Sequence, residues 1–310
     1  MSRAVNDLAH IIVVICLPDR VCRPMREAAR SEPQNLRRSL VNSPLLVAEE
    51  LVARPELPPR GDVTGRKIVI TLGGAFEFQV GRSVTWVDSS RLLFAHNGES
   101  YVDRHVLSGI GHCSLILTPD DEALDEVWGD SRAHQDVRVR ACSIRMQMLA
   151  QLLRRVSEPL AAEELGVAIL EECVADKRRV GSIDQRCVRR AKAMLHDCPD
   201  GRLSLSEIAS DLGVTSIYLT QCFKRSEGVP LYRYQTLLRL SRALDRLPEC
   251  SDITDLAFEL GFSSHSHFTA VFRNELGTTP SQFRSQTRPF EFAALCDRQS
   301  SVFHASVRRS

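Results

Sequence analysis

The residues with the clearest chemical potential form two stripes at helical spacing in the last third of the chain. The stripes and their adjoining residues are Ile217, Thr220, Gln221, Lys224 and Arg225, and then His265, Ser266, Thr269, Ala270 and Arg273. Residues three and four apart share one helix face. Methyl groups and a Gln amide match base edges in the major groove of DNA, and Lys and Arg match phosphate oxygens. Each stripe is therefore predicted to contact double-stranded DNA.

The stripes lie in an internal repeat. Ile208-Ala-Ser-Asp-Leu-Gly213 resembles Leu256-Ala-Phe-Glu-Leu-Gly261, and Leu219-Thr-Gln-Cys-Phe-Lys224 resembles Phe268-Thr-Ala-Val-Phe-Arg273. The offset is 48 residues for the first pair and 49 for the second. Two short helices joined by a glycine-containing turn are typical of a helix-turn-helix, so the repeat predicts two such units.

Local signals mark where the helices of each unit begin and end. Ser204, with Glu207 three residues later, forms a capping box, which favours a helix start. Gly213 and Gly261 suit the turns because glycine adopts a positive φ at little cost. The residues expected in the cores of the second helices are Leu219, Cys222 and Phe223, and in the other copy Phe268, Val271 and Phe272. Cys222 is therefore expected to be an inert core thiol.

A helix between the two copies would set their separation. Pro230 to about Leu247 has the apolar spacing of a helix. Its ~17 residues would span ~25 Å at 1.5 Å per residue. Major-groove segments on one face of DNA lie ~34 Å apart, so a rod of this length, with a unit at each end, would let one chain bind two half-sites.

The same residues resemble a known family. The segment from Gly261 to Gly277, with Thr279-Pro-Ser-Gln-Phe-Arg284 after it, is similar to the signature of AraC/XylS (arabinose-regulator) transcription factors, as is Arg239-Leu-Ser-Arg-Ala-Leu244. The resemblance covers about residues 183–285. It implies a regulator that binds promoter DNA, acts on RNA polymerase and responds to a small-molecule effector. Ala270 stands where many members carry a long basic residue, so the second unit is expected to bind bases weakly.

The preceding part of the chain shows the period-two pattern of a sheet. From about Arg66 to Leu117, short alternating runs are separated by turn signals, which predicts a small β sandwich or barrel. Phe94-Ala-His-Asn-Gly-Glu-Ser-Tyr101 resembles the cupin-like sensor half of the same family. Trp86 and Tyr101 could line a pocket there or simply pack. Further helices are expected at Pro119–Trp128, Ile144–Val156 and Leu160–Lys177. The last two could pack on the sheet or form the seam of a homodimer, and the sequence leaves both open.

These patterns predict an α+β chain with an N-terminal cupin-like β sandwich or barrel with helices and a C-terminal all-α domain. The expected boundaries are 1–60 for an N-terminal arm, 61–180 for the sensor with central helices, 181–290 for the two-unit helix-turn-helix domain and 291–310 for a tail. Within the arm, Ile11–Cys16 could be a short strand.

Composition limits the classes of protein to be considered. The 310 residues include 40 Lys and Arg and 39 Asp and Glu, which argues against a uniformly basic nucleic-acid coat protein. Residues 61–180 carry 14 basic and 18 acidic residues, and residues 181–290 carry 14 and 12. The ten cysteines lack C-x-x-C spacing, and the apolar run His10–Leu17 is too short to span a bilayer. We expect a cytoplasmic protein with no membrane partner.

Metal chemistry is the first alternative to regulation. The polar residues that resemble the metal set of cupin enzymes are His96, Glu99, His105 and His112. They lack the H-x-H pair that such enzymes use within one strand, so ordinary surface or core roles, or ligand contact, are preferred. His265 and His267 do form H-x-H, but His265 suits a DNA contact and His267 could stabilise the turn.

Redox and catalytic roles are the second alternative. Cys113 follows His112 and would be reactive if its pKa were lowered, although a buried sheet cysteine is the default. Phosphate-loop, Rossmann and Gly-x-Ser-x-Gly signatures are absent from the sequence. A repair protein with a methyl-accepting cysteine is disfavoured for want of a zinc–thiolate cluster. The preferred prediction is a sequence-specific DNA-binding regulator without catalytic residues, metal or cofactor and with unknown effector contacts; the alternative is a cupin-type enzyme or redox sensor that binds DNA secondarily.

Overall fold

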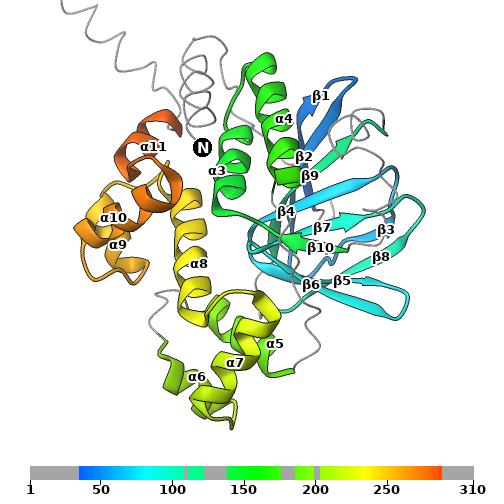
Figure 1. Ribbon diagram of the computed structural model, residues 1–310. Helices are drawn as coiled ribbons and strands as arrows, with labels where there is room; N and C mark the ends of the chain where they lie inside the picture. The colour runs from blue at the N-terminus through cyan, green and yellow to red at the C-terminus, as the bar shows by residue number, and fades with distance from the viewer. Residues whose placement is uncertain (1–34, 108–110, 122–137, 176–185, 199–202, 288–310) are drawn as a thin grey trace, which may run out of the picture.

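The computed structural model describes residues 35–107, 111–121, 138–175, 186–198 and 203–287 (Figure 1). The strand expected at residues 11–16, most of the helix expected at 119–128 and the tail from 291 lie outside these residues. The described chain divides into a sheet-rich N-terminal part and a helical C-terminal part, which confirms the α+β class.

The sheet-rich part contains two antiparallel sheets that face each other. The six-stranded sheet has, in spatial order, β1 (Leu36–Asn42), β2 (Leu46–Ala53), β9 (His112–Pro119), β4 (Lys67–Gly73), β7 (Arg91–Ala95) and β10 (Val139–Ala141). The four-stranded sheet has β3 (Arg60–Asp62), β8 (Ser100–His105), β5 (Ala75–Val80) and β6 (Ser83–Asp88). This arrangement confirms a β sandwich, and its cupin-like character stays a prediction.

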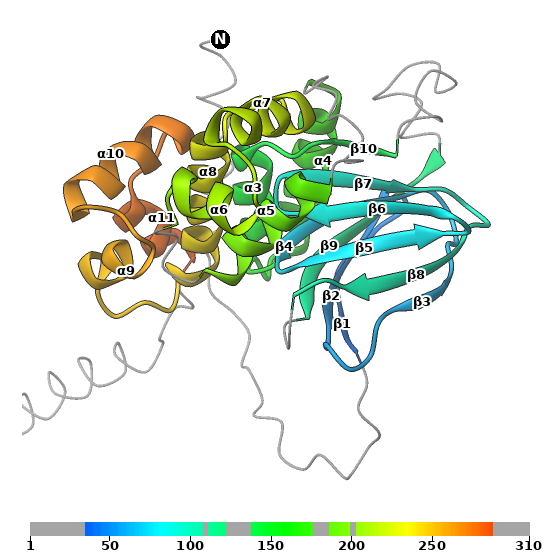
Figure 2. The ribbon, with the colours of Figure 1, turned by 90° about the horizontal axis from the view of Figure 1, so that it is seen from below.

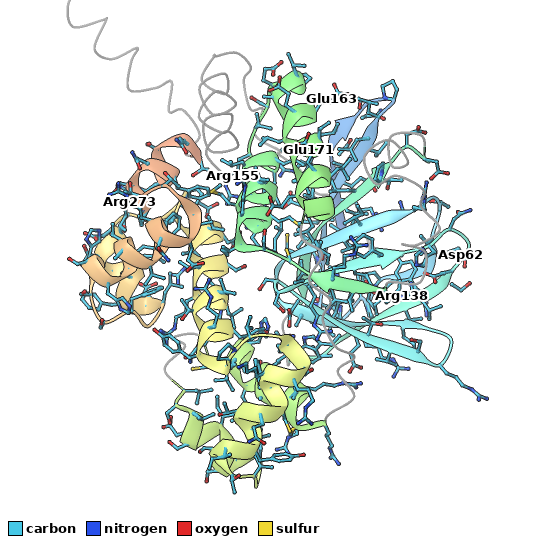
Figure 3. All side chains as sticks on the ribbon, in the orientation of Figure 1. Asp62, Arg138, Arg155, Glu163, Glu171 and Arg273 are labelled. Atoms are coloured by element: carbon cyan, nitrogen blue, oxygen red, sulfur yellow. The ribbon has the colours of Figure 1, made fainter. Side chains whose placement is uncertain are left out.

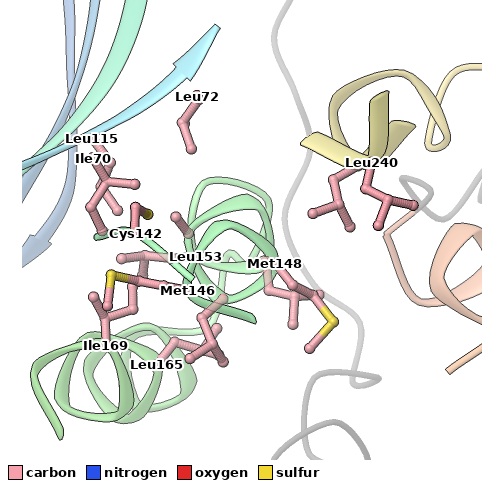
Figure 4. Close-up of a cluster of buried hydrophobic side chains, with 14 of the residues drawn as sticks. Ile70, Leu72, Leu115, Cys142, Met146, Met148, Leu153, Leu165, Ile169 and Leu240 are labelled. Atoms are coloured by element: carbon pink, nitrogen blue, oxygen red, sulfur yellow. The ribbon is translucent and has the colours of Figure 1, made fainter. Parts of the chain in front are cut away.

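Strand β4 shows why the central sheet is nearly all apolar. Its two faces are both covered, so the usual alternation with polar residues is lost. Ile68, Ile70 and Leu72 belong to the cluster that includes the helices, and Val69 belongs to the core between the sheets. Figure 4 shows Ile70 and Leu72 on the helix side, with Ile70 next to Leu115 of β9.

Two helices cover the outer face of the six-stranded sheet. They are α3 (Ile144–Leu153) and α4 (Pro159–Ala175), and Met146, Leu165 and Ile169 pack toward the sheet in one buried cluster (Figure 4). Of the two arrangements left open by the sequence, the structure therefore shows packing within the chain.

The sheet begins earlier than the boundary expected at residue 61. Strands β1 and β2 pair with each other, and β2 also pairs with β9. The sequence hides them for two reasons. Strand β1 is an edge strand in which only Val41 is buried, and β2 places Glu50 among its apolar residues, where Arg38 and Arg154 bind the carboxylate at 2.5 and 2.6 Å.

Seven helices make up the described C-terminal part. They are α5 (Arg186–Asp197), α6 (Leu205–Asp211), α7 (Ser216–Glu227), α8 (Leu231–Arg246), α9 (Ile253–Glu259), α10 (His265–Leu276) and α11 (Pro280–Thr287). Helix α8 is the predicted connecting rod, and its 16 residues span about 24 Å. Helices α5–α7 lie at one end of α8 and α9–α11 at the other (Figure 1).

Helix α3 packs between the sheet-rich part and the helical part of the chain. Met148 of α3 points toward Leu240 of α8, and both belong to the same buried cluster (Figure 4). Arg154, which follows α3, lies 2.7 Å from Asp245 near the end of α8. The core of α9–α11 continues into this cluster through Phe268, so the second helical unit packs on the sheet-rich part.

Candidate nucleic-acid interface

The first helical pair, α6 and α7, forms as its local signals require. Ser204 Oγ accepts a hydrogen bond from the Glu207 backbone N–H at 3.2 Å, and the Glu207 carboxylate accepts one from the Ser204 N–H at 2.7 Å. This confirms the predicted capping box. Gly213 ends the pair's first helix with a φ of 65°, a conformation that favours glycine. Thr215 then caps α7 by accepting from the Tyr218 N–H at 3.2 Å.

The predicted stripe of α7 faces away from the core. Leu219, Cys222 and Phe223 are buried, which confirms their core assignment. On the opposite face, Ile217 is 73% exposed. Gln221, Lys224 and Arg225 are exposed, and Thr220 is half-buried, with its hydroxyl donating to the Ser216 carbonyl at 2.8 Å. The Thr220 methyl group is therefore the part of that side chain left to contact a base.

The second pair, α9 and α10, repeats this arrangement. Ser264 caps α10 by accepting from the His267 N–H at 3.1 Å. The Ser263 hydroxyl and His267 Nδ1 lie 3.0 Å apart, and the His267 ring meets Phe262 edge-on, so His267 fastens the turn. In the predicted stripe, the exposed residues are Ser266, Ala270 and Arg273. The half-buried residues are His265 and Thr269.

Helices α7 and α10, which carry the two stripes, lie on one side of the helical region. Figure 2 shows α7 and α10 together above α6, α9 and α11. Arg273 projects from α10 on the side away from the sheets (Figure 3). All ten residues predicted to contact DNA are at least partly exposed while the sheet-rich part is packed against the helices. One partner could therefore meet both stripes without separation of the two parts.

Sequence reasoning missed one exposed aromatic residue on this surface. Tyr218 is 50% exposed and adjoins Ile217 in the first turn of α7. Its position outside the apolar core stripe was the available signal. An aromatic ring with a hydroxyl at this place can stack on a sugar or donate to a phosphate.

Comparisons with known proteins agree with the repeat. A family model described as a helix-turn-helix domain matches residues 208–286. The HTH-type transcriptional regulator ArgR of Pseudomonas aeruginosa is 31% identical over 164 residues, which are 49% of each chain. The Msm operon regulatory protein of Streptococcus mutans is 28% identical over 140 residues, which are 43% of this chain and 50% of that one. The chain thus spans about half the length of these curated relatives.

The C-terminal region is a helix-turn-helix domain of the AraC/XylS type. Two solved structures are also similar to this chain. An AraC-type DNA-binding regulator from Chromobacterium violaceum is 31% identical, with a TM-score of 0.31, over 33% of this chain and 91% of that chain. ToxT from Vibrio cholerae is 15% identical, with a TM-score of 0.34, over 83% and 98%.

The histidines that resembled a metal set lie apart from the AraC/XylS-type domain and do not form one group. Glu99 is bound at 2.5 Å by Arg138 and accepts from the His96 N–H at 2.9 Å. The rings of His105 and His112 lie 5.3 Å apart. Among the described residues, no three His, Cys, Asp or Glu side chains are placed to hold a metal ion.

Strand geometry separates Cys113 from His112. Neighbouring side chains of a strand point to opposite faces, and His112 stacks on Phe76 inside the sandwich, while Cys113 packs on the helix side. Burial raises the pKa of the Cys113 thiol to about 12, despite the nearby Arg154. The thiolate needed for redox chemistry is therefore disfavoured there.

His112 belongs to a polar cluster between the sheets. Its Nε2 lies 3.7 Å from Asp103 Oδ2, and both side chains are almost fully buried. Burial raises the pKa of Asp103 to about 8 and lowers the pKa of His112 to about 3. Both groups are consequently uncharged at neutral pH, which is the form that an interior site favours.

The raised pKa of Asp103 predicts how stability depends on pH. The folded chain holds a proton on Asp103 that the unfolded chain releases, so this contribution to stability is lost as the pH rises toward about 8. Between pH 6.5 and 8, above the ordinary His pKa, the free energy of unfolding should fall by up to ~1.4 kcal/mol per unit from this group. Asp103→Asn should remove that part of the slope in urea titrations.

The matched control is Asp62→Asn, which changes an exposed carboxylate of the same sheet (Figure 3). It should keep the wild-type slope. An unchanged slope in Asp103→Asn would show that Asp103 is already ionised in the folded chain.

Proposed function

We propose that this chain is a sequence-specific transcriptional regulator that binds double-stranded promoter DNA through α7 and α10. The observation that carries the proposal is the pair of exposed stripes, one on each helix-turn-helix unit, at the two ends of α8. Ile217, Thr220 and Gln221 are assigned to bases in the first half-site. Lys224 and Arg225 are assigned to phosphates.

The second unit receives the corresponding assignments. His265, Ser266, Thr269 and Ala270 face bases, and Arg273 faces a phosphate. The small Ala270 side chain offers only a methyl contact, so most sequence discrimination should come from α7. Because the described part of the AraC/XylS-type domain presents few basic residues in these stripes, affinity depends on specific contacts rather than on bulk charge.

The sheet-rich part is proposed to be the sensor of a small-molecule effector. Its interior offers buried polar atoms without a hydrogen-bond partner among the described residues, namely Asp103 Oδ1, His112 Nδ1 and Ser114 Oγ. Buried polar atoms of this kind are normally satisfied, so they suit a ligand with hydroxyl or amide groups.

Other parts of the proposal follow from the family. The regulator acts in the cytoplasm, recruits or hinders RNA polymerase and performs no catalysis. The domain limits proposed are the sensor up to about residue 180 and the DNA-binding domain over 181–290. None of the described helices has the length and apolar composition of a membrane span.

Two substitutions on one helix test the DNA assignment. Gln221→Ala should weaken binding by about 1–3 kcal/mol at sites that carry the preferred base and little elsewhere. Lys224→Ala should weaken every sequence alike and lower the slope of log affinity against log salt by about one. Binding of each variant to a randomised site library at several salt concentrations measures both effects.

The half-buried Arg66, which pairs with the exposed Asp121 at 2.7 Å on the sheet-rich part, supplies the control. Arg66→Ala should leave sequence preference and salt slope as in the wild type. Identical profiles for Gln221→Ala and Lys224→Ala would overturn the division between base and phosphate contacts. Absence of any sequence preference in the wild type would overturn the proposed function.

A further inference from the structure

A cluster of buried charges lies where the sheet-rich part meets the first helix-turn-helix unit. Asp88 ends β6 and Arg91 begins β7, so both flank the short turn by which the chain passes from one sheet to the other. Lys192 lies on α5, and Glu227 is the last residue of recognition helix α7. Each of these four side chains is at most 2% exposed. We call these four residues the charge cluster.

Ion pairs of the charge cluster cross the boundary between the sheet-rich part and the helical part. Lys192 Nζ lies 2.7 Å from Asp88 Oδ2, and Arg91 Nη2 lies 2.9 Å from Glu227 Oε1. Lys192 Nζ also lies 3.1 Å from Glu227 Oε2, within the helical unit. Each side contributes one cation and one anion. The charge cluster is therefore neutral as a whole and is fully paired only when the two parts are in contact.

Directional hydrogen bonds fix the Asp88 carboxylate within the charge cluster. It accepts from Trp86 Nε1 at 2.7 Å, from the Ser90 hydroxyl at 2.6 Å and from the Tyr234 hydroxyl of α8 at 3.0 Å. Lys192 Nζ lies 5.0 Å from the centre of the Tyr234 ring. These partners come from β6 and the turn after it, from α5 and from α8, so a shift of the first unit would break several contacts at once.

The energetics of buried ion pairs point to positioning rather than to bulk stability. A buried pair gains little over a well-packed apolar replacement, but it tolerates only one geometry because a displaced charge is left unpaired. The other end of α8 is also held, since Asp245 lies 2.7 Å from Arg154. The sheet-rich part thus contacts both ends of the rod that joins the two units.

We propose that the charge cluster fixes the position of α7 relative to α10, so that the chain binds two half-sites at one spacing only. This inference rests on the proposed function. Arg91 and Asp88 touch no DNA, and they act through Glu227 and Lys192. The arrangement that they hold is the binding-competent one, because both stripes are exposed in it.

The test uses the full chain and Arg91→Met. This change removes the cation that reaches α7 from the sheet, while Glu227 keeps Lys192 as a partner inside its own unit. The probes are the DNA site selected by the wild type from a random library, the same site with one or two base pairs inserted between the half-sites, and the site with the second half-site scrambled.

In the wild type, insertion should weaken binding by about tenfold or more, because the second contact loses its effective concentration. Arg91→Met should weaken binding to the unaltered site by about tenfold, lose less than about threefold more on insertion and leave the scrambled probe within about twofold of the wild type. A merely structural role would lower affinity for all probes together. Equal weakening of Arg91→Met on all probes would overturn the proposal, and so would an Arg91→Met variant that depends on spacing as strongly as the wild type does.

Two further variants keep the result interpretable. Arg91→Lys keeps a cation at the pair across the boundary and should retain the dependence on spacing; if Arg91→Met does not fold, Arg91→Lys decides, and loss of the dependence on spacing in it overturns the proposal. Arg66→Met, at the pair with Asp121, should match the wild type on every probe.

Hydrogen exchange of the DNA-free chain separates the positioning from the proposed function. Amides of α5 and α7 should exchange faster in Arg91→Met than in the wild type, because the first unit is released from the turn between β6 and β7. If the wild type bound no DNA, the proposed function would fail. The exchange rates would still decide whether the charge cluster holds the first helix-turn-helix unit. Unchanged rates would overturn the positioning role.

Discussion

Lys192→Ala should lower the free energy of unfolding by about 3–5 kcal/mol, because Asp88 and Glu227 would remain buried without the cation that they share. The ammonium group is fully buried and lies within 3.1 Å of both carboxylates. Urea denaturation followed by far-UV circular dichroism measures the change. A loss of this size would make Lys192 one of the most sensitive polar positions of the described chain.

The pH dependence of that loss follows from Asp88. Burial raises the pKa of Asp88, but the charges of Lys192 and His196 outweigh burial and hold the pKa well below its usual value. The ionised group thus adds stability in the wild type that disappears as the pH falls. Without Lys192 the carboxyl should take up a proton at higher pH, so the deficit of the variant should shrink as the pH is lowered from neutrality.

Lys67→Ala provides the comparison for Lys192→Ala. Lys67 is a half-buried lysine on β4 whose Nζ donates to Thr118 Oγ1 at 3.0 Å. The same chemical change there should cost about 1 kcal/mol or less, since no buried carboxylate is left behind. Equal losses at the two lysines would contradict the account of Lys192.

Phe268→Ala should destabilise the second helix-turn-helix unit by about 3–5 kcal/mol and abolish its share of DNA binding. The ring is fully buried, 4.9 Å from Phe262 and 5.6 Å from Phe272 between ring centres. Removing it leaves a cavity directly beneath the exposed stripe of α10. Denaturation and binding to the scrambled and intact sites measure the two effects.

Phe258, on α9 of the same unit, is 44% exposed and offers a matched control. Phe258→Ala should cost less than about 1 kcal/mol and leave binding to both half-sites intact. If Phe268→Ala weakened the contacts of α7 and α10 equally, the two units would not be separable in binding.

The helix-turn-helix units could be predicted because their signals are local. The capping box joins Ser204 and Glu207, three positions apart, and the glycine turns and core stripes lie within the next few turns. Each signal depends on neighbours in the sequence. The helices were therefore located correctly, and the outward direction of Ile217 and Gln221 followed from the core residues opposite them.

Contacts between distant segments left weaker signals. Tyr234 and Asp88 are 146 positions apart, and a charged residue is ordinarily expected at the surface. One signal was nevertheless present, because Lys192 falls on the apolar stripe of α5 with Val188, Ala191 and Leu195. The first strands were missed for another reason: an edge strand such as β1 buries one face only partly, so its residues do not alternate clearly.

The connecting helix α8 restricts how this protein can change in length. Each residue added within a helix advances it by about 1.5 Å and turns everything beyond it by roughly 100°. Because both ends of α8 are held by the sheet-rich part, a single inserted residue would rotate the stripe of one unit away from the stripe of the other unit. It would also rotate that unit away from the residues that support it. Even the insertion of a whole turn, which would restore the rotation, would move one end of α8 by about 5.4 Å from its supports. The length of α8 is therefore set by the sheet-rich part as well as by the separation of the two units.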